Sequence, residues 1–431
     1  MKHTKRSGDL GSRFGRRRLA AVAAVAALAL LGAACGDDDG TGTGTGTGAD
    51  TSADAELLGP RQPASGEPVK VGVISDGRTP AFDNSIQFDA AEAVATFINE
   101  HRGGIGGRPI ELVTCETAAD PAKATDCANQ FVQADVQIVA IGEITGMAQV
   151  WGPLHDAGIP IIVYGTTEAS ALLDQDSTFV LASQITALAD FPIAVAKEHG
   201  LKKVTVVVID VPVATGFYDT VGTDFYKEAG IELEVIAVPP GTADMTTQMS
   251  RVSSGETAVH VIGNDSFCIA AFNGLRAMNF TGPVSVLNQC ITDSSRSAVG
   301  DYLEGMYMAS PSALGDRENR DLLQWEAIAR TYGEDIDLSN AMGPAMYMTM
   351  MAMREALDGI SGEITSASMI ETIKSMPKKP LPLGSGLDFQ CNGQAYPLTP
   401  AVCVDSVLVT TLDKDGQPVP PYRPVSELGA G

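Results

Sequence analysis

The residues of this 431-residue chain whose types could support catalysis or binding are seven cysteines, five histidines and the acids and hydroxyls of its loops. The histidines are scattered, without the HExxH spacing of a zinc protease, and none lies beside a candidate nucleophile in the sequence. The sequence also contains neither a GxSxG elbow nor a Walker phosphate loop. These patterns predict a binding protein and not an enzyme, with no cofactor and no metal site.

Six of the cysteines are spread through the body of the chain. An even number of cysteines is typical of disulfides in an exported protein. Sequence alone leaves the connectivity open, and no CxxC pair suggests a zinc ribbon or a thioredoxin-like site. Proximity favours three pairs: Cys115 with Cys127, Cys268 with Cys290, and Cys391 with Cys403.

The amino terminus has the pattern of an export signal. Arg16-Arg17-Arg18 precede an uncharged run over residues 19–34, which is shorter than the about 20 residues that a membrane span needs and suits a signal-peptide core. Leu31-Gly32-Ala33-Ala34-Cys35 resembles the lipobox of bacterial lipoproteins, which implies lipidation of Cys35, although Gly32 replaces the usual branched apolar residue. The alternative is an ordinary secretory signal, and the Sec and twin-arginine routes both remain open.

A low-complexity segment follows this cysteine. Residues 36–48 read GDDDGTGTGTGTG and contain no apolar side chain to bury, so they predict a flexible tether. A weaker bias continues to about residue 66. We therefore expect a signal peptide at residues 1–34 and a lipidated cysteine with a flexible linker at residues 35–66.

The charge of the chain restricts its partners. The formal net charge is −24, and residues 1–34 hold seven of the 29 basic residues, so the remainder is more acidic still. Such a body repels phosphate backbones, which excludes nucleic acid as a partner. With 44% hydrophobic residues, the chain has enough apolar surface for packed cores.

The body alternates short apolar runs with amphipathic segments. Strand-like runs at residues 69–75, 109–114, 137–141 and 160–163 are separated by helical windows. A second series of the same kind spans residues 185–287. The alternation predicts an α/β protein with two doubly wound lobes, each a parallel sheet covered by helices on both faces.

Several segments resemble the branched-chain amino acid type of periplasmic solute-binding protein, the substrate-binding subunit of ABC importers. The resemblance is carried by the runs NE at residues 99–100, GGIGGRPIELV at residues 103–113 and DPAKA at residues 120–124. It implies the type I periplasmic binding fold, in which a three-crossing hinge joins two lobes that trap the ligand. By this analogy, lobe 1 comprises residues 67–181 plus 311–385, and lobe 2 residues 182–310 plus 386–431.

The expected pocket lies beyond the carboxyl ends of the strands, where loops lead into helices. In the first lobe, those loops span residues 76–83, 142–147 and 164–168. The amino terminus of a helix offers N–H groups and a partial positive charge that suit a carboxylate. The resemblance implies that the carboxylate and amine of an amino acid are gripped by Thr145, Gly146, Gly165 and Thr167.

Other candidates come with an alternative role. Thr166 and Thr167 can cap a helix as well as contact a ligand. Tyr164 can stack on a ligand or belong to the core, and Glu143 is a candidate acid. In the second lobe, Thr215 stands where the family often has an aromatic residue followed by glycine. Asp265 is the candidate partner of a ligand ammonium group, with helix capping as its alternative.

Together these features predict an exported lipoprotein, anchored by lipid to the outer face of the cytoplasmic membrane. It captures an amino acid, an amide or a small carboxylate and delivers it to ABC permease subunits. The alternatives are a ligand-sensing receptor subunit of the same fold and an extracytoplasmic enzyme.

Overall fold

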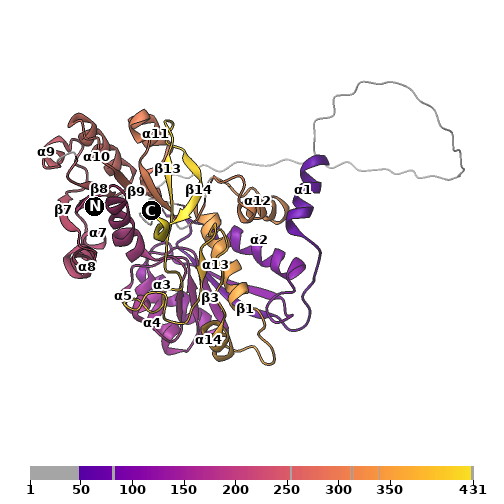
Figure 1. Ribbon diagram of the computed structural model, residues 1–431. Helices are drawn as coiled ribbons and strands as arrows, with labels where there is room; N and C mark the ends of the chain where they lie inside the picture. Colours follow the sequence, from indigo (N-terminus) through magenta and orange to yellow (C-terminus); the bar gives the residue numbers. More distant parts are fainter. Residues whose placement is uncertain are drawn as a thin grey trace, which may run out of the picture. The chain divides into compact units, whose positions relative to one another are not determined.

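Two sheets built mainly of parallel strands organise the chain, as Figure 1 shows. The computed structural model describes residues 48–79, 83–252, 255–310, 312–313, 315–338 and 340–428. The expected signal segment and Cys35 lie outside these residues. Across the described part of the chain, no helix has the length and apolar character needed to cross a membrane.

The first sheet has five parallel strands in the order β2-β1-β3-β4-β5. Their bounds are β1 Val69–Ser75, β2 Ile110–Glu116, β3 Ile138–Ile141, β4 Ile161–Val163 and β5 Thr178–Val180. The inner strands β1, β3 and β4 are almost wholly apolar because helices bury both faces of the sheet, whereas the edge strand β2 carries two glutamates. All five strands end at the same edge, and the segments that follow β1, β3, β4 and β5 line the candidate site.

Side chains of β1 alternate between two cores. Val71 and Val73 belong to the core that contains α2 (Ile86–His101), α12 (Arg320–Tyr332) and α13 (Met342–Ala356). Ile74 belongs to the opposite core, with α3 (Pro121–Gln133) and α4 (Met147–Asp156). Two further helices, α5 (Ala169–Leu173) and α14 (Ser366–Ser375), complete this part of the chain. The alternation of side chains along the strand therefore places helices on both faces.

The second sheet has seven strands in the order β14-β13-β10-β9-β8-β6-β7. Five are parallel, and the carboxyl-terminal hairpin of β13 and β14 adds two antiparallel strands at one edge. The strand bounds are β6 Lys203–Ile209, β7 Glu232–Val238, β8 Ala258–Ile262, β9 Val284–Leu287, β10 Tyr307–Ser310, β13 Leu408–Leu412 and β14 Pro418–Pro424. The predicted pair of parallel α/β units is confirmed.

The helices of the second unit follow the same alternation along the chain. They are α6 Phe191–Glu198, α7 Pro212–Phe217, α8 Thr223–Glu228, α9 Thr246–Met249, α10 Asp265–Ala277 and α11 Asp293–Val299. A π-helical turn over Thr186–Asp190 precedes α6, and a second over Tyr218–Gly222 joins α7 to α8. The short pair β11 (Lys379–Pro380) and β12 (Asp388–Phe389) forms a separate small sheet.

The carboxyl-terminal segment divides between the two sheets. Residues 401–403 lie beside β5 of the first sheet, because the Val180 backbone N–H donates to Ala401 and the Cys403 N–H donates to Val180. Ala401 and Val402 are buried in a core of that first sheet, whereas β13 joins the second. The carboxyl-terminal segment therefore still contacts the first sheet at residues 401–403, beyond the boundary predicted at residue 386, and joins the second sheet from β13 onward.

The expected flexible linker also differs from the structure in its second half. Residues Gly48–Leu58 form helix α1, which contacts α12. The Arg330 guanidinium donates to both carboxylate oxygens of Asp54 at 2.6 and 3.1 Å, and Gln324 donates to the Leu57 carbonyl at 2.7 Å. Leu58 is buried. The reason is compositional: the Gly-Thr repeat ends at residue 48, and the next residues combine helix formers with two leucines.

Three disulfides link neighbouring segments. They join Cys115 to Cys127, Cys268 to Cys290 and Cys391 to Cys403, the pairs that sequence proximity favours. The first attaches α3 to β2, and the second attaches α10 to the turn after β9. Each closes a loop of 12 or 22 residues and so restricts the unfolded chain.

Candidate functional site

A cavity of about 420 Å³ lies at the carboxyl end of the first sheet. It is lined by residues from the loops after β1, β3 and β4, in which the sequence places the pocket, and by Gln184 from the segment after β5. Parallel topology brings these loops together, because all three strands end at the same edge. The lining residues are Asp76, Asn84, Glu143, Ile144, Thr145, Met147, Ala148, Gly165, Thr166, Thr167, Glu168 and Gln184.

Asp76 organises the inner wall of this cavity. Its side chain is only 1% exposed and follows β1 directly. One carboxylate oxygen accepts hydrogen bonds from the Thr117 hydroxyl at 2.5 Å and the Thr145 hydroxyl at 3.3 Å. The other accepts the Thr145 backbone N–H at 2.9 Å. Asp76 therefore joins the loops that follow β1, β2 and β3.

These contacts change the role available to Thr145. The residue lines the cavity, as the sequence predicts. However, its backbone N–H and its hydroxyl both donate to Asp76, so neither is directed at a ligand carboxylate in this structure. Gly146 is the N-cap residue of α4 and does not line the cavity. The first turn of α4, with Met147 and Ala148, contributes to the wall in its place.

Glu143 carries a second carboxylate into the cavity. Loss of solvation and, to a smaller extent, repulsion from Asp76 raise the pKa of its carboxyl group above the ordinary value. The loop that presents it is held by the buried amide of Gln87 on α2. Gln87 accepts the Glu143 N–H at 3.0 Å and donates to the Glu143 carbonyl at 3.1 Å.

Glycine is required at position 142 to allow this approach. A Cβ atom there would lie 2.1 Å from the Gln87 Oε1. We expect Gly142→Ala to displace Gln87, break both hydrogen bonds to Glu143 and lower the free energy of unfolding by about 1–3 kcal/mol. Urea unfolding measures this loss.

Gly165→Ala is the matched control for that change. Gly165 lines the same cavity, but a Cβ atom there would lie 3.8 Å from its nearest neighbour, which is an ordinary contact. Equal stability of the two variants would contradict the argument.

The loop after β4 closes the cavity on the side of α5. Gly165, Thr166 and Thr167 line the cavity, as predicted, and Thr167 is exposed to it. Neither threonine caps a helix. Glu168 is the N-cap residue of α5 and accepts the Ser170 N–H at 3.1 Å, while the Thr166 hydroxyl accepts the Glu168 N–H at 3.0 Å.

The remaining sequence candidates lie outside the lining. Tyr164 is half-buried beside the core, and burial together with the neighbouring Glu143 raises the pKa of its phenol. Thr215 lies in α7, and its hydroxyl donates to the Val211 carbonyl at 3.3 Å. Asp265 is the first residue of α10, whose N-cap is Asn264. The structure thus groups Glu143, Thr145 and residues 165–167 but not these three.

Sequence reasoning did not select Asp76, Asn84, Gln87 or Gln184. Asp76 had a usable signal, since it is the first residue after an apolar strand whose loop was expected in the pocket. Gln87 had none, because its role depends on a partner 56 positions away.

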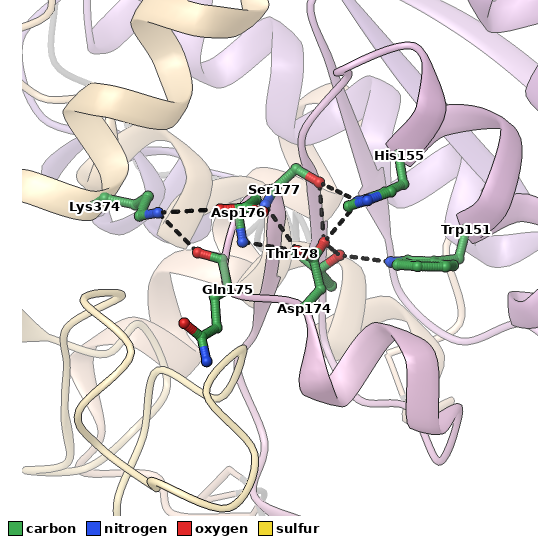
Figure 2. A network of polar contacts seen from close by, with 8 residues as sticks. All are labelled: Trp151, His155, Asp174, Gln175, Asp176, Ser177, Thr178 and Lys374. Carbon is green, nitrogen blue, oxygen red and sulfur yellow. Dashed lines mark hydrogen bonds and ion pairs between the residues drawn. The ribbon is translucent and has the colours of Figure 1, made fainter.

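A polar network joins α4 to the segment after α5, and Figure 2 shows its members. Asp174 follows α5 and is buried, and it accepts hydrogen bonds from the N–H groups of Asp176 and Ser177 and from the hydroxyls of Ser177 and Thr178. Burial alone would raise the pKa of Asp174, but these hydrogen bonds lower it overall. Trp151 of α4 donates to the Thr178 hydroxyl at 3.1 Å. The network therefore fixes α4 and α5, which both begin at the cavity.

The network contains serine, histidine and aspartate but lacks the geometry of a catalytic relay. In a relay, the serine and the aspartate contact opposite ring nitrogens of the histidine. Here Ser177 and Asp174 both approach Nδ1 of His155, at 3.2 and 3.3 Å, and the Ser177 hydroxyl donates to Asp174 at 3.0 Å. This geometry gives Ser177 no base, so the trio has a structural role.

Comparison with known proteins identifies the family to which this architecture belongs. The family model described as "Periplasmic binding protein" matches residues 68–407. None of the curated proteins is significantly similar in sequence.

Solved structures share the fold at low identity. An ABC transporter substrate-binding protein from Sphaerobacter thermophilus is 19% identical with a TM-score of 0.65, and the match covers 83% of this chain and 98% of that one. The branched-chain amino acid transporter substrate-binding protein LivJ from Streptococcus pneumoniae, in complex with isoleucine, is 16% identical with a TM-score of 0.60 over 83% of this chain and 100% of its own.

A third structure extends the range of bound solutes. It is a solute-binding protein of an ABC transporter from Rhodopseudomonas palustris in complex with p-hydroxybenzoic acid. It is 20% identical, with a TM-score of 0.62, and the match covers 83% of this chain and 96% of that one. The type I periplasmic binding fold expected from the sequence is confirmed, and the chain belongs to the periplasmic binding protein family.

Proposed function

We propose that this protein is the extracytoplasmic solute-binding lipoprotein of an ABC importer. The observation that carries the proposal is the polar cavity at the carboxyl ends of β1, β3 and β4, in a chain of the periplasmic binding protein family. Its volume of about 420 Å³ suits a small metabolite. The solute leaves unchanged, so no bond is made or broken.

The proposed ligand is an amino acid or a similar small polar metabolite. The Streptococcus pneumoniae structure holds isoleucine and the Rhodopseudomonas palustris structure holds p-hydroxybenzoic acid, so relatives of this fold bind small solutes of different charge. In this chain, Gly165, Thr166 and Thr167 are the proposed contacts from the first lobe. Closure requires that the ligand bind the closed form better, so Thr215 and Asp265 are the proposed contacts from the second lobe.

A thermal-shift screen of the purified full-length protein tests solute binding. Amino acids, amides and small carboxylates are each added in excess, and the bound compound is recovered and identified by mass spectrometry. A ligand present at a hundredfold excess over its Kd should stabilise the protein by about 3 kcal/mol. A turnover product in place of the intact solute would contradict the proposal, as would a flat response across all three classes.

The proposed attachment to the membrane is a diacylated or triacylated Cys35, since stable anchoring needs more than one acyl chain. We expect Cys35→Ser to abolish incorporation of an alkyne-labelled fatty acid and to move the protein from the membrane fraction to the soluble fraction. Gly32→Leu, which restores a branched residue to the lipobox, should remain labelled. Label retained in the Cys35→Ser protein would show that the anchor lies elsewhere.

A further inference from the structure

The charge of the cavity wall selects among the solutes that the proposed function allows. Three lining residues are acids, Asp76, Glu143 and Glu168, and no described lining residue is a lysine or an arginine. A ligand carboxylate would therefore enter a site that already holds carboxylates and offers it no cationic side chain. Like charges at short distance in a partly desolvated site repel strongly.

Some of the donors that could offset this repulsion are used within the protein. Thr145 gives its backbone N–H and its hydroxyl to Asp76. The Glu168 backbone N–H donates to the Thr166 hydroxyl. The amides of Asn84 and Gln184 are neutral donors, and the amino terminus of α4 carries the equivalent of about half a positive charge, so together they do not balance three carboxylates. This amino terminus can orient a carbonyl or weakly hold the carboxylate of a zwitterion.

Asp76 and Glu143 are both acids that no basic side chain of the described residues neutralises. The charged form of Glu143 is disfavoured, as the raised pKa of its carboxyl group indicates, because the site is desolvated and Asp76 repels it. None of the ion pairs found among the described residues involves Asp76, Glu143 or Glu168. An ammonium group has three donors and no acceptor, and its hydrogen bonds to carboxylates are charge-assisted.

The loops at the strand ends of the second sheet also carry acids and lack basic residues. Asp210 follows β6 and Asp265 follows β8, whereas neither lysine nor arginine occurs within residues 210–222 or 263–275. The whole chain is strongly acidic, with a formal net charge of −24, so its long-range field also attracts cations.

We propose that the solute carried by this protein is a small amine whose positively charged nitrogen is bound between Asp76 and Glu143, and that net-positive ligands bind more tightly than zwitterions and zwitterions more tightly than acids. The inference rests on the proposed function, because it names the solute class of the same cavity. It excludes acids without an amino group, which a carboxylate-binding wall would favour.

Calorimetric titration of the purified full-length protein with solutes matched in shape tests this order. One series is leucinamide, leucine and 4-methylpentanoate, which are a cation, a zwitterion and an anion on one carbon skeleton. A second series of linear amines and acids begins with 1,4-diaminobutane and succinate. Within each series that binds, we expect affinity to fall from cation to anion by about tenfold or more at each step.

Charge variants at the cavity test the same preference by changing the protein instead of the carbon skeleton of the solute. Glu143→Gln should weaken binding of the amine about tenfold, the effect of losing one charge-assisted hydrogen bond. Thr167→Lys adds a cation at an exposed lining position and should weaken amine binding while strengthening binding of the matched acid. Glu371→Gln removes an exposed acid on α14, outside the cavity, and should leave both affinities unchanged.

The outcomes separate this inference from the function on which it rests. An acid that binds more tightly than its matched amine would overturn the inference and leave solute capture intact. Unchanged amine affinity in both Glu143→Gln and Thr167→Lys would overturn it as well. Absence of binding by every cationic, zwitterionic and anionic solute would instead overturn the proposed function.

Discussion

Acidification from pH 7 to pH 4 is expected to lower the free energy of unfolding by about 3 kcal/mol through His260 alone, because burial depresses the pKa of its imidazole from 6.5 to about 3. His260 lies in β8 with no exposed surface. Its Nδ1 contacts the Ser285 hydroxyl at 2.9 Å, and that hydroxyl donates to the Val259 carbonyl at 3.2 Å. The other ring nitrogen has no hydrogen-bond partner among the residues that the structure describes. Burial outweighs the hydrogen bond with Ser285, which by itself favours the protonated ring, so the folded state keeps the imidazole neutral.

The sign of the effect follows from the two pKa values. Between pH 6.5 and pH 3, the unfolded chain binds a proton at this histidine and the folded chain does not. Protons therefore favour unfolding, and the stability that is present above pH 6.5 is lost as the pH falls toward 3. Below that value, both states are protonated and the contribution stops changing.

Urea unfolding at a series of pH values, compared between the native protein and His260→Asn, isolates this contribution. Asparagine retains a donor toward Ser285 but does not titrate, so the variant should lose less stability between pH 7 and pH 4. Val261→Ala is the control, since it alters the same buried strand without removing a titratable group and should lower stability equally at every pH. Parallel curves for the native protein and His260→Asn would contradict the assignment.

Asp76 is expected to give the largest effect on ligand binding, and two substitutions separate its two roles. Asp76→Ala removes the acceptor of the Thr117 hydroxyl and of both Thr145 donors, in a site where water cannot easily replace it. We expect a loss of about 2–3 kcal/mol in unfolding free energy and of roughly a hundredfold in ligand affinity, because unpaired buried donors are costly and the loops separate.

Asp76→Asn keeps the shape and removes the charge. Its amide oxygen can still accept the Thr145 N–H, and its NH₂ group can donate to the threonine hydroxyls, which rotate to accept. Stability should therefore stay within about 1 kcal/mol of the native protein. Affinity for an amine should nevertheless fall about tenfold, since a charge-assisted hydrogen bond is lost.

Urea unfolding and calorimetric titration of both variants distinguish these roles. Equal stability of the alanine and native proteins would show that Asp76 does not hold the three loops together. Equal amine affinity of the asparagine and native proteins would show that the Asp76 charge does not contact the ligand.

Much of the architecture can be predicted from local pattern. The alternation of apolar runs with amphipathic windows indicates parallel sheets, because a strand buried on both faces has no polar period. The ends of the strands indicate the pocket loops without any knowledge of side-chain contacts. For this reason Glu143 and residues 165–167, which line the cavity, could be named as candidates from the sequence. The close spacing of the cysteines indicated their pairing for the same local reason.

Contacts between distant residues were not predictable in this way. The composition around α1 predicts a flexible segment, but residues far along the chain hold it in place. Arg330 and Gln324 of α12 hydrogen-bond to it, and Leu58 is buried in the core. The division of the carboxyl-terminal segment likewise depends on which strand edge is free to accept it. Residues 401–403 pair beside β5, and β13 pairs with β10.

The amino-acid sequence by itself determined the class of fold, the location of the pocket and the acidity of its loops, since each depends on residue type and on spacing along one segment. Only the tertiary structure decided what each polar group faces. Asp76 takes the Thr145 N–H across 69 positions and Gln87 holds Glu143 across 56, so a wall that resembled a carboxylate clamp in sequence presents carboxylates of its own. The physical reason is that each donor forms one hydrogen bond, and the acceptor that it meets lies on a distant segment that only the fold brings close.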